Sequence, residues 1–182
     1  MLDACVLFPP VVRGLLLGAG AAGLIAPHWS ARILEEWRRA ALAKTKSGPD
    51  IPALHGRMEE SFPGALLPPD PELEATLLLP DPADAHVVAA ASRGAVATIV
   101  TFNLKDFPRR TLAGLGMTAR HPDDLLWELH STHTVDLTPA LQATAEAFDA
   151  TSPDATRRLL KRAKLPRLAK AVAPCVPPGP GG

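Results

Sequence analysis

The segment from Leu79 to Pro108, LPDPADAHVVAAASRGAVATIVTFNLKDFP, constrains the fold most, because signals for a helix, a strand and a polar turn follow one another in it. Asp81 followed by Pro82 is typical of an N-cap with proline at the first helical position. After Gly94 comes ATIVT at 97–101, a short apolar run typical of a strand buried on both faces. This order predicts a βαβ unit in a parallel α/β sheet.

Three polar side chains of this segment are candidates for one site. Asp84 lies on the apolar face of the predicted helix, where an isolated carboxylate is costly. It suits either a first-turn position, where free amides favour an acid, or a site that holds a cation. Asn103 and Asp106 follow the predicted strand, and ligands of open parallel sheets bind beyond the carboxyl ends of the strands. An Asx turn that only reverses the chain is the alternative for these two residues.

Two further acids precede this segment. Residues 1–8 are predicted to form an apolar strand, and its one charge, Asp3, is costly there unless it faces a polar site. A frayed N-terminus that leaves Asp3 in water is the alternative. Ser30 is expected to cap a helix that continues to Leu42, and Glu36 lies at the edge of its apolar stripe. Glu36 is therefore a site candidate or an ion-pair partner of a nearby arginine.

Four blocks occur in this order: DACVLF, WSARILEEW, LPDPADAHVVAAA and TFNLKDFP. They resemble the signature of the PIN-domain ribonucleases, the toxin nucleases of bacterial VapBC-type pairs, over about residues 1–128. The resemblance implies a three-layer α/β/α fold with a mainly parallel central sheet, in which acids meet at one end and hold Mg²⁺ or Mn²⁺. Asp81 matches a frequent neighbour of the third acid and takes second rank. The family's acids and its variable fourth block match Asp3, Glu36, Asp84, Asn103 and Asp106.

The resemblance predicts a metal-dependent endoribonuclease that hydrolyses RNA phosphodiester bonds. Hard divalent cations take oxygen ligands, and Mg²⁺ also accepts phosphate oxygens of a substrate. Asp3, Asp84 and Asp106 are expected to bind the metal directly or through water, and Asn103 to support its shell. Glu36 is expected to orient the attacking water or to bind a second metal. The resemblance further implies 5′-phosphate and 3′-hydroxyl ends. It also implies an RNA substrate, a cognate antitoxin protein and a homodimer.

Composition limits the remaining possibilities. A length of 182 residues with 47% hydrophobic content suits one core with an appendage. No apolar run reaches membrane-spanning length and the start lacks a basic stretch, so a cytoplasmic location is expected. Cys5 and Cys175 form no metal or redox spacing and are expected to be free thiols. GAGAAG at 18–23 satisfies a dinucleotide-binding pattern but is interpreted as the end of a helix from about Pro10.

The formal net charge is zero, but cations gather towards the end of the chain. Residues 1–130 are predicted to form the PIN-like nuclease domain, 131–173 a helical C-terminal extension, and 174–182 a disordered tail rich in proline and glycine. Ser152 and Pro153 are expected to open a helix, and a second short turn should follow Pro166. The basic face of the first helix is a candidate for contact with nucleic acid or a partner protein, or is simply solvated. It consists of Arg157, Arg158, Lys161 and Arg162.

Two alternatives to a toxin stay open. One is a PIN-type nuclease that processes RNA without being a toxin. A neighbouring antitoxin gene, or growth arrest on expression, would indicate a toxin instead. The other is a non-catalytic binding module that keeps the fold. Mn²⁺ should raise the melting temperature of an intact site and leave that of a binding module unchanged.

Overall fold

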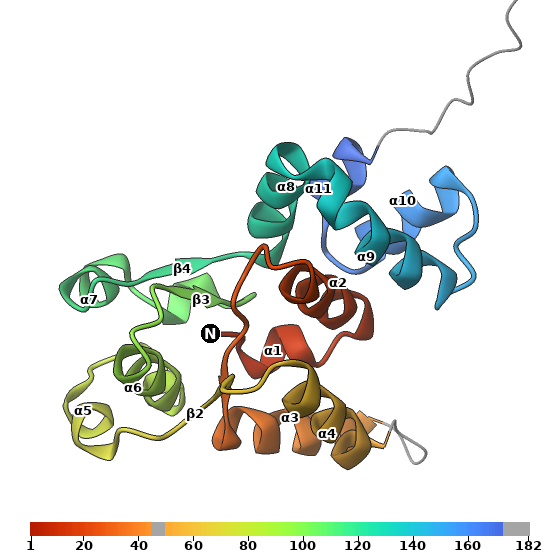
Figure 1. Ribbon diagram of the computed structural model, residues 1–182. Helices are drawn as coiled ribbons and strands as arrows, with labels where there is room; N and C mark the ends of the chain where they lie inside the picture. Colours follow the sequence, from red (N-terminus) through yellow and green to blue (C-terminus); the bar gives the residue numbers. More distant parts are fainter. Residues whose placement is uncertain (45–49, 173–182) are drawn as a thin grey trace, which may run out of the picture.

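The computed structural model describes residues 1–44 and 50–172, and in this part of the chain helices surround short parallel strands (Figure 1). β1 (Trp29–Ser30) pairs in parallel with β2 (Leu66–Leu67), and β3 (Thr98–Val100) pairs in parallel with β4 (Thr118–Arg120). The parallel pairing agrees with the predicted fold class, although each strand has only two or three residues. The described chain is thus a mixed α/β structure that is mostly helical.

The first residues lie between the two strand pairs. The Leu2 N–H donates to the carbonyl of His28 at 2.8 Å, and the Val100 N–H donates to that of Met1 at 2.8 Å. Leu2 also forms a parallel bridge with Val100. Main-chain hydrogen bonds therefore connect β2, β1, the N-terminal residues, β3 and β4 in that order, with the N-terminal residues in the middle.

The predicted strand over residues 1–8 is wrong after Asp3, because Ala4–Leu7 form the short helix α1. The Asp3 carbonyl accepts hydrogen bonds from the Val6 and Leu7 N–H groups at 3.1 and 3.2 Å, which closes the first turn. Val6 and Leu7 are buried there. Such a short apolar run has no periodicity that separates a buried strand from a buried helix, which explains the error.

Other helices begin at the caps that the sequence indicates. Ser30 Oγ accepts from the Ile33 N–H at 3.3 Å, and Ser152 Oγ accepts from the Ala155 N–H at 3.2 Å. The α-helices after α1 are α2 (Pro10–Ala21), α3 (Ala31–Lys44), α4 (Ile51–Ser61), α5 (Pro71–Thr76), α6 (Ala85–Arg93), α7 (Arg109–Gly114), α8 (Pro122–Thr132), α9 (Thr134–Glu146), α10 (Pro153–Arg162) and α11 (Pro166–Ala171). Two single 3₁₀ turns, η1 (Pro82–Asp84) and η2 (Leu104–Asp106), precede α6 and α7.

Helix α2 contains most of the GAGAAG segment, and its small residues allow close packing. A Cβ at Gly18 would lie 2.4 Å from Ala140 Cβ in α9, so only glycine permits this approach without a shift. The helix ends at Ala21, within the motif. The interpretation of GAGAAG as the end of a helix that begins near Pro10 is confirmed.

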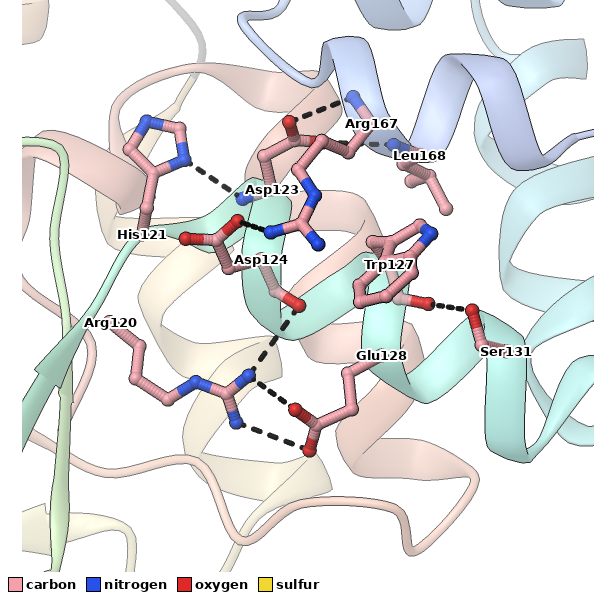
Figure 2. A network of polar contacts seen from close by, with 9 residues as sticks. All are labelled: Arg120, His121, Asp123, Asp124, Trp127, Glu128, Ser131, Arg167 and Leu168. Atoms are coloured by element: carbon pink, nitrogen blue, oxygen red, sulfur yellow. Dashed lines mark hydrogen bonds and ion pairs between the residues drawn. The ribbon is translucent and has the colours of Figure 1, made fainter.

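A buried carboxylate joins α11 to α8. Asp123 is 3% exposed, and its Oδ2 and Oδ1 accept from the N–H groups of Arg167 at 2.8 Å and Leu168 at 3.0 Å (Figure 2). Asp124 pairs with the Arg167 guanidinium, which lies 4.0 Å from the centroid of the Trp127 ring. These five residues, here called the Asp123 clip, hold the start of α11 against α8.

Two other sequence predictions can be placed. Cys5 is a free thiol, whereas Cys175 and the predicted tail at 174–182 lie outside the described residues. Within the described ranges, no helix combines the length and apolar character that a membrane span requires.

Candidate active site

Asp3 stands where the N-terminal residues turn into α1, and it is only 5% exposed. Its Oδ2 accepts hydrogen bonds from Thr101 Oγ1 at 2.7 Å and from Cys5 Sγ at 3.0 Å. Thr101 Oγ1 in turn accepts from the Asn103 N–H at 3.0 Å. The alternative of a frayed N-terminus is therefore wrong, because Asp3 is tied to the end of β3.

The thiol beside Asp3 is a hydrogen-bond donor. Burial, and then the charge of Asp3, raise the pKa of Cys5 to about 12. The Phe102 N–H donates to Cys5 Sγ at 3.2 Å. Cys5 therefore stays protonated near neutral pH and helps to fix Asp3.

The two acids before α6 play different parts. Asp81 Oδ1 accepts from the Ala83 N–H at 2.9 Å, so Asp81 caps η1 as predicted. The Asp84 side chain makes no cap hydrogen bond, and its carboxylate accepts none from the described residues. Burial, and then the negative charges of Asp3, Asp81, Asp106 and Glu36, raise the pKa of Asp84 to about 6. Every acid predicted for the site thus acts electrostatically on Asp84.

Glu36 projects from α3 towards α6. Its Oε1 lies 3.0 Å from His86 Nε2 and 3.6 Å from Arg32 Nε. His86 is 5% exposed, and neither ring nitrogen has a hydrogen-bond partner with suitable geometry among the described residues. The short contact with Glu36 is therefore not a hydrogen bond. The pair with Arg32, which was the alternative role for Glu36, is also present but is half-exposed and adds little stability.

The residues after β3 lie at the same edge. Asn103 precedes η2 and is exposed, and its side chain makes no cap hydrogen bond. The Asx-turn alternative is therefore not formed by Asn103. Asp106 ends η2, is partly buried, and is among the acids whose charge acts on Asp84.

The side chains fit a hard divalent cation in charge and in ligand type. All the predicted ligands offer oxygen atoms, and a bound cation offsets both the burial and the mutual repulsion that raise the pKa of Asp84. Within residues 1–44 and 50–172, no three His, Cys, Asp or Glu side chains are already arranged around one point as metal ligands. The acids thus share one electrostatic environment without forming a closed coordination cage.

A cavity of about 550 Å³ has Glu36 in its lining, whereas Asp3, Asp81, Asp84 and Asp106 do not line it. Cys5, Glu36 and Asn103 line it, together with Arg162 and Lys164 from the end of α10 and the turn after it. A larger cavity of about 820 Å³ lies between α9 and α10 and contains none of the predicted site acids. The cavity beside Glu36, here called the acid cleft, is the one near the candidate chemistry.

The four predicted basic contacts separate into three kinds. Arg157 Nε donates to the Val172 carbonyl at 3.0 Å, so this side chain holds the end of α11. Arg158 and Lys161 are exposed on α10 and do not line the acid cleft. Only Arg162 does.

Sequence reasoning missed Thr101, His86 and Lys164. Thr101 closes the strand run ATIVT, whose only polar side chains are the hydroxyls of Thr98 and Thr101, and that was a usable signal. His86 stands two residues after Asp84 at the start of an apolar helix, and this position was a second usable signal. Lys164 belongs to the acid-free basic run at 157–170, but no local signal separates it from the other cations there, because its place in the cavity lining depends on how α10 and α11 pack.

A parallel α/β arrangement with acids at the carboxyl end of its strands is a usual setting for a ligand or metal site. Comparison with protein families matches residues 1–105 to the PIN domain. The match covers more than half of the chain, so the protein belongs to the PIN domain family, a nuclease fold family whose members are typically metal-dependent. Searches of curated proteins and of solved structures gave no match.

Proposed function

We propose that this protein is an endoribonuclease dependent on Mg²⁺ or Mn²⁺, with Asp3, Glu36, Asp84 and Asp106 as its catalytic acids. The observation that carries the proposal is the position of Asp3. A buried carboxylate is bound through Thr101 to the end of β3, where Asn103 and Asp106 follow. Membership of the PIN domain family supports the same reaction class.

In this proposal Asp3, Asp84 and Asp106 hold the ion and Asn103 supports its shell. When bound, the ion polarises the phosphodiester and acidifies a water molecule. Thr101 and Cys5 donate to Asp3 Oδ2, so Asp3 Oδ1 would be the oxygen available to hold an ion. Glu36 would orient the attacking water and accept its proton.

We further infer that the protein is the toxin of a type II toxin–antitoxin pair and acts as a homodimer in the cytoplasm. The resemblance of its four sequence blocks to VapBC-type toxins supports this. On this view residues 1–130 form the nuclease domain and 131–173 its extension. Growth arrest on expression, relieved by a small protein encoded next to the gene, is the expected behaviour; an RNA-processing nuclease would cause no arrest.

The test compares purified wild type with Asp84→Asn and Asp81→Asn on single-stranded RNA. The wild type should cleave with Mn²⁺ and not with EDTA, leaving 5′-phosphate ends. Asp84→Asn should be inactive, whereas Asp81→Asn keeps the cap geometry and most of the activity. A wild type that binds RNA but never cleaves it with either metal would identify a binding module instead.

A further inference from the structure

We propose that the turn between α10 and α11 belongs to the active site, with Arg162 and Lys164 binding the phosphate backbone of single-stranded RNA in the acid cleft. The proposal rests on the nuclease function above and adds the surface that holds its substrate. Lys164 belongs to the basic run at 157–170 but not to the four residues that the sequence indicates as candidate contacts. The juxtaposition of these cations with the acids comes from the fold.

The acid cleft has two kinds of wall. Glu36 and Asn103 come from α3 and from the turn after β3, and Arg162 and Lys164 face the same cavity from the C-terminal helices. A carboxylate cluster repels RNA, so a cleft that receives RNA needs cations near the acids to hold the backbone phosphates. Arg162 and Lys164 meet this need in the cavity that they share with Glu36 and Asn103.

Both cations are available to a ligand. Arg162 and Lys164 are exposed, and neither forms an ion pair with the described residues. Arg157 and Arg167 of the same region differ, since they bind the Val172 carbonyl and Asp124 respectively. Arg157 and Arg167 therefore hold the C-terminal helices together, whereas Arg162 and Lys164 face the acid cleft.

The backbone of Lys164 supports a role for its side chain. Its φ of 62° lies in the left-handed region, at the position after a helix where glycine is usual. Strain of this kind persists where the side chain is needed or where the surroundings impose it. Lys164 Nζ lies 5.5 Å from the centroid of the Phe102 ring, which directs the ammonium group towards the residue before Asn103.

The turn is fixed from both sides. Leu165 is fully buried, and just after it the N–H groups of Arg167 and Leu168 donate to the Asp123 carboxylate (Figure 2). Cations on a fixed turn lose less conformational freedom on binding than cations on a loose tail. This makes the α10–α11 turn a rigid second wall for the substrate.

The experiment measures binding of a short fluorescein-labelled oligouridylate to the full-length protein by fluorescence anisotropy, in EDTA so that no cleavage occurs. The test variant is Arg162→Gln with Lys164→Gln. The matched control is Arg57→Gln with Lys170→Gln, which removes the same charge from exposed sites outside the cleft. Melting temperatures of all variants confirm folding.

Loss of two phosphate contacts should weaken binding roughly 20-fold near 0.1 M salt and lower the slope of log Kd against log salt by about 1.4. The control pair should stay within about threefold of wild type. Equal losses in the two pairs, or no loss in either, would overturn the proposal. If the wild type fails to cleave RNA with Mn²⁺, the nuclease function fails while a selective binding loss still supports this surface.

A second variant separates charge from backbone strain. Lys164→Gly removes the ammonium group and suits the left-handed conformation. It should melt no lower than the wild type and still bind the oligouridylate about fivefold more weakly. Unchanged affinity in this variant would contradict the role of Lys164.

Discussion

Asp84 and Asp123 both stand at the start of a helix, but their surroundings differ completely. Asp123 is buried with both oxygens accepting main-chain N–H groups, at 2.8 and 3.0 Å. Asp84 accepts no hydrogen bond from the described residues, and four other acids act on it. A carboxylate with satisfied oxygens stabilises the fold, whereas one kept unsatisfied among like charges lowers stability and marks a functional site. The comparison predicts opposite consequences of removing each charge.

The largest expected effect is on catalysis at Asp84. Asp84→Asn keeps the size of the side chain but removes a metal-binding charge, so RNA cleavage should fall at least about 100-fold. Initial rates with Mn²⁺ on single-stranded RNA measure this. Asp124→Asn, an acid of the Asp123 clip, is the matched control and should stay within about twofold. Comparable losses in both variants would mean that Asp84 has no special role.

The next effect is on stability at Asp123. Asp123→Ala leaves the Arg167 and Leu168 N–H groups without a partner, which should lower the free energy of unfolding by about 2–3 kcal/mol. Asp124→Ala removes only a partly exposed ion pair and should cost under about 1 kcal/mol. Urea unfolding of the two variants compares them directly. If Asp123→Ala is as stable as Asp124→Ala, the clip does not anchor α11.

A substitution at Thr101 tests whether its hydrogen bond holds the Asp3 carboxylate in the orientation that binds metal. Thr101 is fully buried, and Thr101→Val keeps its shape while removing the hydroxyl that binds Asp3 Oδ2 at 2.7 Å. Asp3 then turns more freely, and Mn²⁺ affinity should fall about tenfold. Thr98→Val, at the start of the same strand, is the control. Isothermal titration with Mn²⁺ measures both, and equal affinities would show that Thr101 does not position Asp3.

The smallest effect is the pH dependence of stability without metal. Because the pKa of Asp84 is raised to about 6 from 3.8, the folded state binds this proton more tightly than the unfolded state does. Stability should therefore rise as the pH falls from 7 towards 4, by about 1 kcal/mol once screening of this partly exposed group is included. In Asp84→Asn this contribution should vanish. Urea midpoints at several pH values in EDTA measure it, and an unchanged pH slope in the variant contradicts the assignment.

Local chemistry allowed much of the fold to be predicted. The caps at Ser30, Asp81 and Ser152 were found because each is decided by its own and the next few residues. The strand at 98–100 followed from β-branched residues after a glycine. Residues 1–8 were predicted as a strand because a short apolar run suits a helix equally well, and here the main-chain bonds of Asp3 decide.

The candidate site was only partly predictable, for the same reason. The acids could be named because carboxylates are rare in apolar segments and therefore conspicuous. The side chains around the acids could not be predicted, because they come from distant parts of the chain. Thr101 donates to Asp3 from 98 positions away, and His86 lies beside Glu36 from a different helix. The place of Lys164 depends on the Asp123 clip, which forms between residues 44 and 45 positions apart.

Thermal unfolding of wild type and Asp84→Asn at pH 7, in EDTA and then in saturating Mn²⁺, tests the central claim most directly. Without metal, Asp84→Asn should melt above the wild type because a repulsive charge is gone. With Mn²⁺ at about 100 times its Kd, the wild type should gain about 2.7 kcal/mol and overtake the variant. A wild-type melting temperature that Mn²⁺ leaves unchanged would contradict the assignment of this acid cluster as a metal site.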